Sequence, residues 1–362
     1  MTKAAGWTWD RALSGIVPPT ISPLDLSREI DEGAIGHLVE HVLQGGCSGL
    51  FVLGGCGEGA WLPSRQRGTV VRAFVRAEAG RVPVLAGVML PATGPAVEAA
   101  RQAAAEGADA VVVGSPYYFG VDGTAQRRHI ETVIEAADRP ALLYNIPQCT
   151  NQVLAPALVA DLARDSRVLG IKDSAGDFVA FQAFLAVKAT RPDFRVLQGH
   201  EHLVAASLRL GGDGLVPGLA NVVPALMVEL RVAAARGDGV ACTRIQGAIL
   251  DLCAIHEIGH WLPALKATSA SRRSRSVAMT ERRNDGIPTN AAFQRGSAPG
   301  CIRGPLRPRR APARVPRLAR RSRARSRAAP APPRWRGARS PSPAPAAAPA
   351  RRSRSRSWRR PP

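Results

Sequence analysis

Two residues near the middle of the chain, Tyr144 and Lys172, have side chains that could act on a carbonyl group. The chain has only four lysines among 49 basic residues, so arginine supplies positive charge wherever charge alone is needed. Lys172 is the only lysine within an apolar run typical of a strand. Burial disfavours an ammonium, so a lysine there can provide the neutral amine that attacks a ketone, which arginine cannot do. The pattern favours a Schiff-base lysine; the alternative is a structural ion pair with Asp173.

Tyr144 ends the apolar run that precedes the one containing Lys172. If the two runs are neighbouring parallel strands, their carboxyl ends bring the phenol and the amine within reach of each other. A phenol so placed can move protons to and from a carbinolamine and a substrate oxygen. The alternative for Tyr144 is core packing with a satisfied hydroxyl.

A second candidate is the segment HEIGH at residues 256–260, which matches the zinc pattern of two histidines four residues apart with a glutamate between them. A zinc hydrolase needs a third ligand. No histidine follows His260, and Lys266 occupies the position six residues on where the extended pattern has one. We therefore expect no metal site, and interpret His256 and His260 as residues on the surface or at an interface of a C-terminal helix.

The elements that must position these side chains are short apolar runs that recur about every 30 residues. They are GIVPPT (15–20), GLFVLGG (49–55), VPVLAGVM (82–89), ADAVVVGSP (108–116), ALLYNIP (141–147), VLGIKDS (168–174), FRVLQGH (194–200) and GDGLVPG (212–218). Each has the length of a buried parallel strand, and helical patterns lie between them. Eight strands alternating with helices predict a (β/α)8 TIM barrel of class α/β, with active-site residues at the carboxyl ends of the strands. The alternative, a doubly wound sheet, should have a GxGxxG motif after an early strand, and GGCGEG does not fit that spacing.

The predicted organisation has four parts: an N-terminal extension (1–14), the barrel (15–220), C-terminal helices (221–268, at about 222–236, 239–258 and 260–268) and a tail (269–362). Residues 271–362 contain 26 arginines, no lysine and two acids, so their net charge is +24. The net charge of the whole chain is +21, so residues 1–270 have a net charge of −3. The tail is rich in Arg, Pro, Ala and Ser and lacks a helical or strand period, which predicts disorder. Its abrupt start favours a shifted reading frame; a genuine tail that binds nucleic acid or another polyanion is the alternative.

The remaining composition predicts a cytoplasmic protein. The six cysteines show no CxxC spacing, so neither a zinc knuckle nor a disulfide framework is indicated. No run of 18 apolar residues exists, and the N-terminus lacks the apolar core of a signal peptide. We therefore expect no membrane segment.

Several motifs occur in a fixed order: GIVPPTISPLD, GGCGEGAWLPSRQR, GSPYY, YNIP, GIKDS and GGDGLVPGLANVVP. From about Gly15 to Lys266 the chain resembles the dihydrodipicolinate synthase / N-acetylneuraminate lyase family of class I aldolases. The resemblance implies a TIM barrel with extra C-terminal helices, truncated here, that assembles as a homodimer or homotetramer, and no cofactor. It also implies a role for each matching residue.

By this resemblance, Lys172 is the Schiff-base lysine and Tyr144 the general acid/base. Tyr118 resembles a tyrosine that reaches across a dimer to a neighbour's site. The substrate-binding positions are Val216 and the loop of residues 54–58, which includes Gly55, Cys56 and Gly57. Backbone N–H groups of this loop, at the start of the next helix, are expected to hold the carboxylate of a 2-oxo acid.

The chain departs from the family pattern at two cysteines. Cys56 stands where many members have a hydroxyl residue, and a thiol is the weaker hydrogen-bond donor. Cys149 stands where dihydrodipicolinate synthases have the arginine that holds the second substrate. The sequence thus favours a lyase or aldolase that acts on pyruvate or a pyruvate-derived 2-oxo acid, by carbon–carbon cleavage or formation or by dehydration. The alternatives are a genuine 4-hydroxy-tetrahydrodipicolinate synthase of lysine biosynthesis and a catalytically weakened barrel that acts as a binding protein.

Overall fold

The computed structural model describes residues 6–254 and 261–269. All of these residues belong to one compact unit, residues 1–289. The HEIGH segment at 256–260 and the basic tail from residue 270 onward lie outside the described residues, so the predictions made for them remain predictions.

The core of the fold is a parallel sheet in which each strand pairs with the next one along the chain. Its strands are β1 (Leu50–Val52), β2 (Val84–Gly87), β3 (Ala110–Val113), β4 (Ala141–Asn145), β5 (Val168–Asp173), β6 (Arg195–Gln198) and β7 (Gly214–Leu215). They correspond to the second to eighth predicted runs. Continuous apolar runs form these strands because both faces of the sheet are covered.

The first predicted run, residues 15–20, closes the sheet into a barrel without forming a regular strand. Ile16 bridges to Leu215 of β7, and Pro19 bridges to Phe51 of β1, both in parallel orientation. Pro18 and Pro19 have no backbone N–H, so the segment cannot form a full ladder with either neighbour. The side chain of Asn221 reinforces the closure by accepting from Ile21 N–H at 3.1 Å and donating to Pro19 O at 3.0 Å. The (β/α)8 barrel prediction is therefore confirmed, with an irregular first strand.

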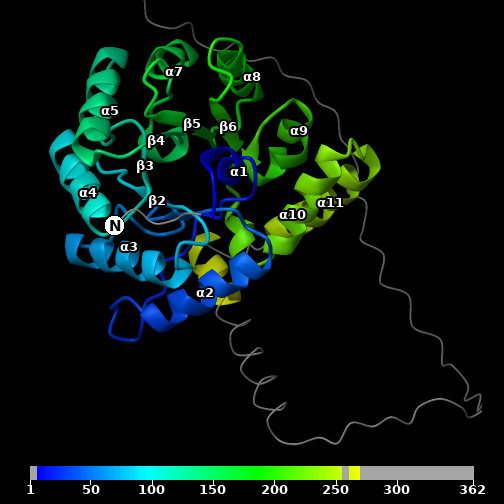
Figure 1. The fold of residues 1–362 in the computed structure, drawn as a ribbon, viewed down its shortest axis with the longest axis horizontal. Coiled ribbons are helices and arrows are strands. Elements are labelled where there is room, and N and C mark those ends of the chain that lie inside the picture. Colours follow the sequence, from blue (N-terminus) through cyan, green and yellow to red (C-terminus); the bar gives the residue numbers. More distant parts are fainter. Residues whose placement is uncertain (1–5, 255–260, 270–362) are drawn as a thin grey trace, which may run out of the picture. The chain divides into compact units, whose positions relative to one another are not determined.

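The helices lie around the outside of the strands (Figure 1). They are α1 (Trp9–Leu13), α2 (Glu32–Gln44), α3 (Ser64–Glu78), α4 (Thr93–Ala105), α5 (Gly123–Ala137), α6 (Pro147–Thr150), α7 (Pro156–Leu162), α8 (Phe178–Ala186), α9 (Val204–Arg209), α10 (Pro224–Ala235) and α11 (Gly239–Cys253). Short 3₁₀ turns are η1 (Val187–Ala189), η2 (Glu201–Leu203) and η3 (Gly218–Asn221). Asp31, Asp122, Asp177 and Asp238 cap α2, α5, α8 and α11 by accepting backbone N–H groups in the first turn, which fixes where these helices begin.

Two apolar layers hold the fold together. The larger one lies between the strands and the surrounding helices. The smaller one fills the barrel interior with inward-facing side chains from successive strands, including Phe51, Leu85, Val112 and Leu142. Leu13, in α1, is fully buried and belongs to this inner cluster, so the segment before the barrel packs against the barrel interior. The interior is thus a packed core that leaves chemistry to the rim.

Within the part of the chain that the structure describes, three C-terminal helices follow β7, near the predicted ranges. They are α10, α11 and residues 261–269. In the last of these, shown in yellow in Figure 1, Leu262 and Leu265 are buried, in agreement with the helical spacing of these two leucines. This helix contacts the barrel rim through Lys266, whose side chain reaches the loop that follows β1.

Candidate active site at the barrel mouth

Tyr144 and Lys172 occupy paired positions at the carboxyl ends of β4 and β5. The Lys172 Nζ atom lies 4.1 Å from the centre of the Tyr144 ring. Both side chains are buried, with exposed fractions of 5% for Tyr144 and 3% for Lys172. The predicted proximity of phenol and amine is therefore present in the structure.

Aromatic rings surround the Lys172 amine. Nζ lies 4.9 Å from the centre of the Phe51 ring, which itself packs edge-to-face on Tyr144. Within residues 6–254 and 261–269, no carboxylate forms an ion pair with Nζ, so the alternative of a pair with Asp173 is not found. A methyl group on Gly199 would lie 2.6 Å from Lys172 Cε, so only glycine leaves room for the lysine stem at that position.

The loop of residues 54–58 follows β1 at the same rim. Cys56 and Gly57 are buried, and Gly55 is exposed. Leu53 and Glu58, on either side, have left-handed backbone conformations with φ of 58° and 55°. The chain turns sharply between them, and turns of successive left- and right-handed residues can form anion-binding concavities of backbone N–H groups. Within the described ranges, no other residue accepts a hydrogen bond from the N–H groups of Gly55, Cys56 or Gly57.

The expected link between this loop and a helix start is wrong. The chain passes through turns from residue 53 to residue 62, and α3 begins only at Ser64. The reason is local: Gly54, Gly55, Gly57 and Gly59 favour turns over a helical start. The candidate anion site therefore depends on loop N–H groups without a helix N-terminus.

The Cys56 thiol lies within the electrostatic reach of Lys172. Burial raises the pKa of Cys56 to about 12, and the positive charge of Lys172 opposes that rise while Glu201 adds to it. The thiol is therefore neutral at physiological pH and is a weak hydrogen-bond donor at this position.

Val216 and Tyr118 differ in their position relative to Tyr144 and Lys172. Val216 directly follows β7, is buried, and belongs to the same inner cluster as Tyr144. Tyr118 follows β3 with a left-handed φ of 81°, and 82% of it is exposed. Its ring packs edge-to-face on the exposed Phe119 and does not point into the barrel of its own chain. The structure thus brings Lys172, Tyr144, Cys56 and Val216 together and leaves Tyr118 apart.

A buried polar layer behind Lys172 was not predicted from the sequence. Asn145, Asp173 and Gln198 are register partners on β4, β5 and β6, and all three are fully buried. Asn145 Nδ2 donates to Asp173 Oδ1 at 2.7 Å, whereas Asp173 Oδ2 and Gln198 Nε2 have no partner among the described residues. Burial raises the pKa of Asp173 to about 6. The sequence contains one signal for this layer: each of these polar residues directly follows an inward-facing residue at the carboxyl end of its strand.

Cys149 lies in α6, directly after β4, and is exposed. Partial burial raises the pKa of its thiol, and the positive charge of Lys172 opposes the rise. Cys149 is therefore on the rim near Lys172. At this position the chain has a neutral thiol and not the guanidinium of an arginine.

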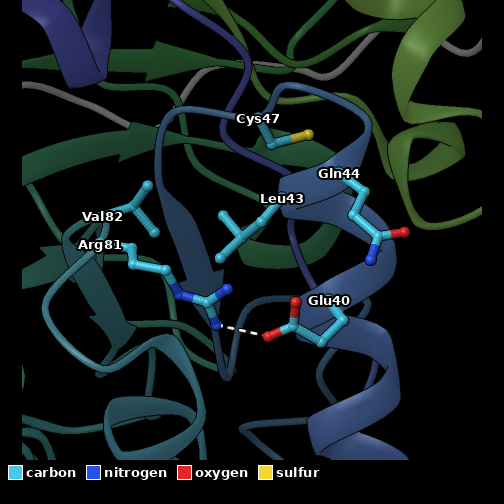
Figure 2. A pocket seen from close by; sticks show the side chains of 6 residues that line it. All are labelled: Glu40, Leu43, Gln44, Cys47, Arg81 and Val82. Carbon is cyan, nitrogen blue, oxygen red and sulfur yellow. Dashed lines mark hydrogen bonds and ion pairs between the residues drawn. The ribbon is translucent and has the colours of Figure 1, made fainter.

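A separate groove of about 330 Å³ lies at the opposite end of the barrel (Figure 2). It lies between α2 and the residues just before β1 and β2, so it faces the amino ends of these strands. Arg81 donates to Glu40 across it at 2.6 Å. In this fold the amino-end face serves stability, and the groove is separate from the site at the rim. Among the described residues no cluster of three or more His, Cys, Asp or Glu side chains could hold a metal ion.

The closed parallel barrel, with a buried lysine and tyrosine side by side at its carboxyl-end rim, defines a barrel lyase of the class I aldolase type. Comparison with known proteins gives the family. Residues 12–271 match the model of the dihydrodipicolinate synthetase family. The chain belongs to the dihydrodipicolinate synthetase family.

The relatives include both synthases and sugar-acid aldolases. The chain is 33% identical over 250 residues to the probable 2-dehydro-3-deoxy-D-pentonate aldolase YjhH of Escherichia coli, covering 68% of this chain and 83% of the relative. It is 34% identical over 260 residues to the 4-hydroxy-tetrahydrodipicolinate synthase of Salinibacter ruber, covering 71% of this chain and 81% of the relative.

A solved structure of a family member has a similar fold. The crystal structure of Escherichia coli YagE in complex with pyruvate matches with a TM-score of 0.68 at 30% identity, covering 71% of this chain and 87% of that one. None of the helices within residues 6–254 and 261–269 is both long and apolar enough to cross a membrane.

Proposed function

We propose that the protein is a Schiff-base lyase that acts on pyruvate or a pyruvate-derived 2-oxo acid, with Lys172 as the nucleophile. The observation that supports this proposal most strongly is the pairing of Tyr144 with Lys172, in register and with Nζ 4.1 Å from the ring centre. Among residues 6–254 and 261–269, no carboxylate forms an ion pair with the buried Lys172 amine, which lies against the rings of Phe51 and Tyr144. The surroundings of this amine suit a reactive group.

In the proposed mechanism, the neutral Lys172 amine attacks the ketone carbon of the substrate and a carbinolamine forms. Tyr144 donates a proton to the departing hydroxyl, which leaves as water, and the Nζ–carbon bond becomes an iminium. The iminium accepts the electron pair released when a bond to the neighbouring carbon breaks, or when a proton leaves that carbon, and becomes an enamine, while the Tyr144 phenolate accepts the proton released in that step. Tyr144 then donates this proton to the enamine carbon, which restores the iminium. Water adds to the iminium as the phenolate accepts a proton from it, and that proton passes to the departing Lys172 nitrogen as the ketone re-forms and the lysine is released.

The loop of residues 54–58 is proposed to bind the substrate carboxylate. The N–H groups of Gly55, Cys56 and Gly57 supply the donors. The loop follows β1, and the ring of Phe51 in β1 lies 4.9 Å from Lys172 Nζ, so the position of the loop suits a 2-oxo acid, whose carboxylate is directly bonded to the ketone carbon. Val216, which directly follows β7 and belongs to the inner cluster, is proposed to line the same space.

Cys149 bears on which substrate class the protein uses beyond the part bound to Lys172. An exposed thiol stands on the rim where a carboxylate-holding arginine is expected in a dihydrodipicolinate synthase. This favours a hydroxylated 2-oxo acid of the sugar-acid type over aspartate semialdehyde, in keeping with the names of two of the relatives. Synthase activity on aspartate semialdehyde is the second candidate, favoured by the name of the Salinibacter relative.

A homo-oligomer is proposed on the basis of Tyr118 and Phe119. These two aromatic side chains are 82% and 76% exposed at the rim. A left-handed backbone at a tyrosine is costly, and it projects the ring away from its own chain. Contact with a second copy would bury both rings.

Borohydride trapping with a panel of 2-oxo acids tests the proposal. The wild-type protein should gain a covalent adduct with pyruvate on the peptide that contains Lys172, and the Lys172→Ala variant should gain none. An adduct on the variant would refute the assignment of Lys172. Turnover of a deoxy sugar acid but not of aspartate semialdehyde would select the first substrate class. Trapping without turnover of any acid would indicate the weakened, binding-only barrel.

A further inference from the structure

The last helix of the described chain contacts the candidate carboxylate loop through one ion pair. Lys266 Nζ lies 2.6 Å from Glu58 Oε2, and the two residues are 208 positions apart in the sequence. Their side chains are only 25% and 18% exposed, so solvent screens this pair less than the surface pairs elsewhere on the barrel. Buried leucines, Leu262 and Leu265, hold the same helix in place.

Glu58 is one of the two residues with a left-handed backbone at which the loop bends. Its φ of 55° lies in the left-handed region that a glutamate adopts only at a cost. Its carbonyl accepts from Trp61 N–H at 2.8 Å and from Leu62 N–H at 3.0 Å, so the conformation of Glu58 sets the path of the chain after the loop. Gly57, directly before it, packs so closely on Leu53 that an added methyl group would lie 2.7 Å from the Leu53 nitrogen.

The same helix also lies near Gly218, in the turn after β7. A methyl group on Gly218 would lie 4.0 Å from Leu265 Cδ2 and 3.5 Å from Cys56 Sγ. Gly218 N–H in turn donates to Glu201 Oε1 at 2.6 Å. The helix of residues 261–269 and the turn after β7 therefore both lie against the loop of residues 54–58.

We propose that Lys266 is a positioning residue for substrate binding, which acts by holding Glu58 and with it the N–H groups of Gly55, Cys56 and Gly57 in the carboxylate-binding geometry. This inference rests on the proposed function, because it assigns Lys266 to the same site. It makes the C-terminal helix part of the binding machinery, although Lys266 itself touches neither the ketone nor Lys172.

The chain offers a matched control. Lys188 forms an ion pair with Asp213 at 2.7 Å, with side chains 28% and 10% exposed, which resembles the Lys266–Glu58 pair in length and burial. Asp213 directly precedes β7, so this pair lies at the amino ends of the strands, away from the rim. Lys266→Met and Lys188→Met thus remove the same charge from pairs of similar length and burial at opposite ends of the barrel, and Asp213 keeps a second partner, Arg195, at 3.4 Å.

The experiment measures the pyruvate concentration that gives half-maximal borohydride trapping, and the trapping rate at saturating pyruvate, in the full-length protein. Lys266→Met should raise the half-saturating concentration about tenfold and leave the saturated rate nearly unchanged, because the loss concerns ground-state binding. Lys266→Arg should keep the half-saturating pyruvate concentration near that of wild type. The double variant with the charges exchanged, Lys266→Glu with Glu58→Lys, should do the same. Lys188→Met should behave as wild type.

Hydrogen exchange of the peptide covering residues 53–62 provides a readout that is independent of catalysis. Exchange should accelerate in Lys266→Met and not in Lys188→Met. If wild type traps pyruvate but Lys266→Met shows unchanged half-saturation, or if Lys188→Met shows the same increase as Lys266→Met, the positioning role is refuted. If wild type traps nothing while exchange changes only in Lys266→Met, the proposed function fails and the link between helix and loop stands.

Discussion

Lys172 and Tyr144 face each other across adjacent strands, with the lysine nitrogen 4.1 Å from the centre of the tyrosine ring and a second ring, that of Phe51, at 4.9 Å. The amine is thus enclosed by aromatic faces and is 3% exposed. A ketone that enters from the rim meets the amine and the phenol together.

Tyr144→Phe should slow turnover by two to four orders of magnitude, the usual worth of a general acid/base. The phenyl ring keeps its contacts with Phe51 and Lys172. The Tyr144 hydroxyl makes no hydrogen bond to any residue in the described ranges, so the thermal midpoint should change little. Steady-state kinetics with the best 2-oxo acid, together with a melting curve, check this. A variant with wild-type turnover would rule out Tyr144 as the proton carrier.

Gly199→Ala should abolish Schiff-base formation without a change of charge. The new methyl group would lie 2.6 Å from Lys172 Cε and 2.2 Å from Ser174 Oγ, so the lysine stem must move. Gly247→Ala in α11, where nothing lies within 4 Å, is the control and should trap normally. Equal trapping by both variants would mean that the lysine adapts and that Gly199 does not shape the site.

The two cysteines near Lys172 should differ in reactivity towards iodoacetamide. Cys149 is exposed, whereas Cys56 is buried with a pKa raised to about 12. At pH 8 the Cys149 peptide should be alkylated and the Cys56 peptide should remain unmodified until the protein unfolds. Peptide-resolved mass spectrometry over time measures both, and Cys149→Ser removes the fast site. Rapid alkylation of Cys56 would show that the loop opens in solution.

Asp173 should make the free energy of unfolding depend on pH in the sense opposite to most carboxylates. Its pKa rises from 3.8 in the unfolded chain to about 6 in the folded one, so the folded state binds more protons between these values. The stability associated with this extra proton is fully present below about pH 4 and is lost as pH rises through about 6. At neutral pH the loss amounts to roughly 2–3 kcal/mol.

The comparison of wild type with Asp173→Asn isolates this contribution. Asn145 can still donate to the remaining amide oxygen at position 173. The stability of the variant relative to wild type should therefore increase from pH 4 to pH 7 and then level off. Urea denaturation at several pH values measures the difference. A difference that is flat across this range would show that Asp173 titrates normally.

Seven of the eight strands predicted from the sequence are regular strands in the structure, because buried parallel strands are continuous apolar runs, whatever their neighbours. The first strand is irregular because Pro18 and Pro19 have no backbone N–H group to donate. The apolar pattern of residues 15–20 does not reveal this, because a regular buried strand has the same pattern. The pairing of Tyr144 with Lys172 was predictable since adjacent strands in this fold end at the same rim.

Other features depend on contacts that no local pattern encodes. The Lys266–Glu58 pair joins residues 208 positions apart, and its only sequence signal is the rarity of lysine in this chain. The polar layer of Asn145, Asp173 and Gln198 depends on register across three strands. The expectation that the loop of residues 54–58 stands at the start of the next helix came from the family resemblance, and it is wrong because the glycine-rich turns continue to residue 62 before α3 begins at Ser64.

The closure of the barrel by residues 15–20 has a consequence for the order of folding. This segment leaves the ribosome early, yet its partners in the closed barrel, Leu215 and Asn221, are synthesised about 200 residues later. Contacts of such long sequence separation form slowly, and domains fold during synthesis from the N-terminus. The nascent sheet must therefore remain open at one edge until β7 has emerged, and the loop of residues 54–58 must wait longer still for Lys266.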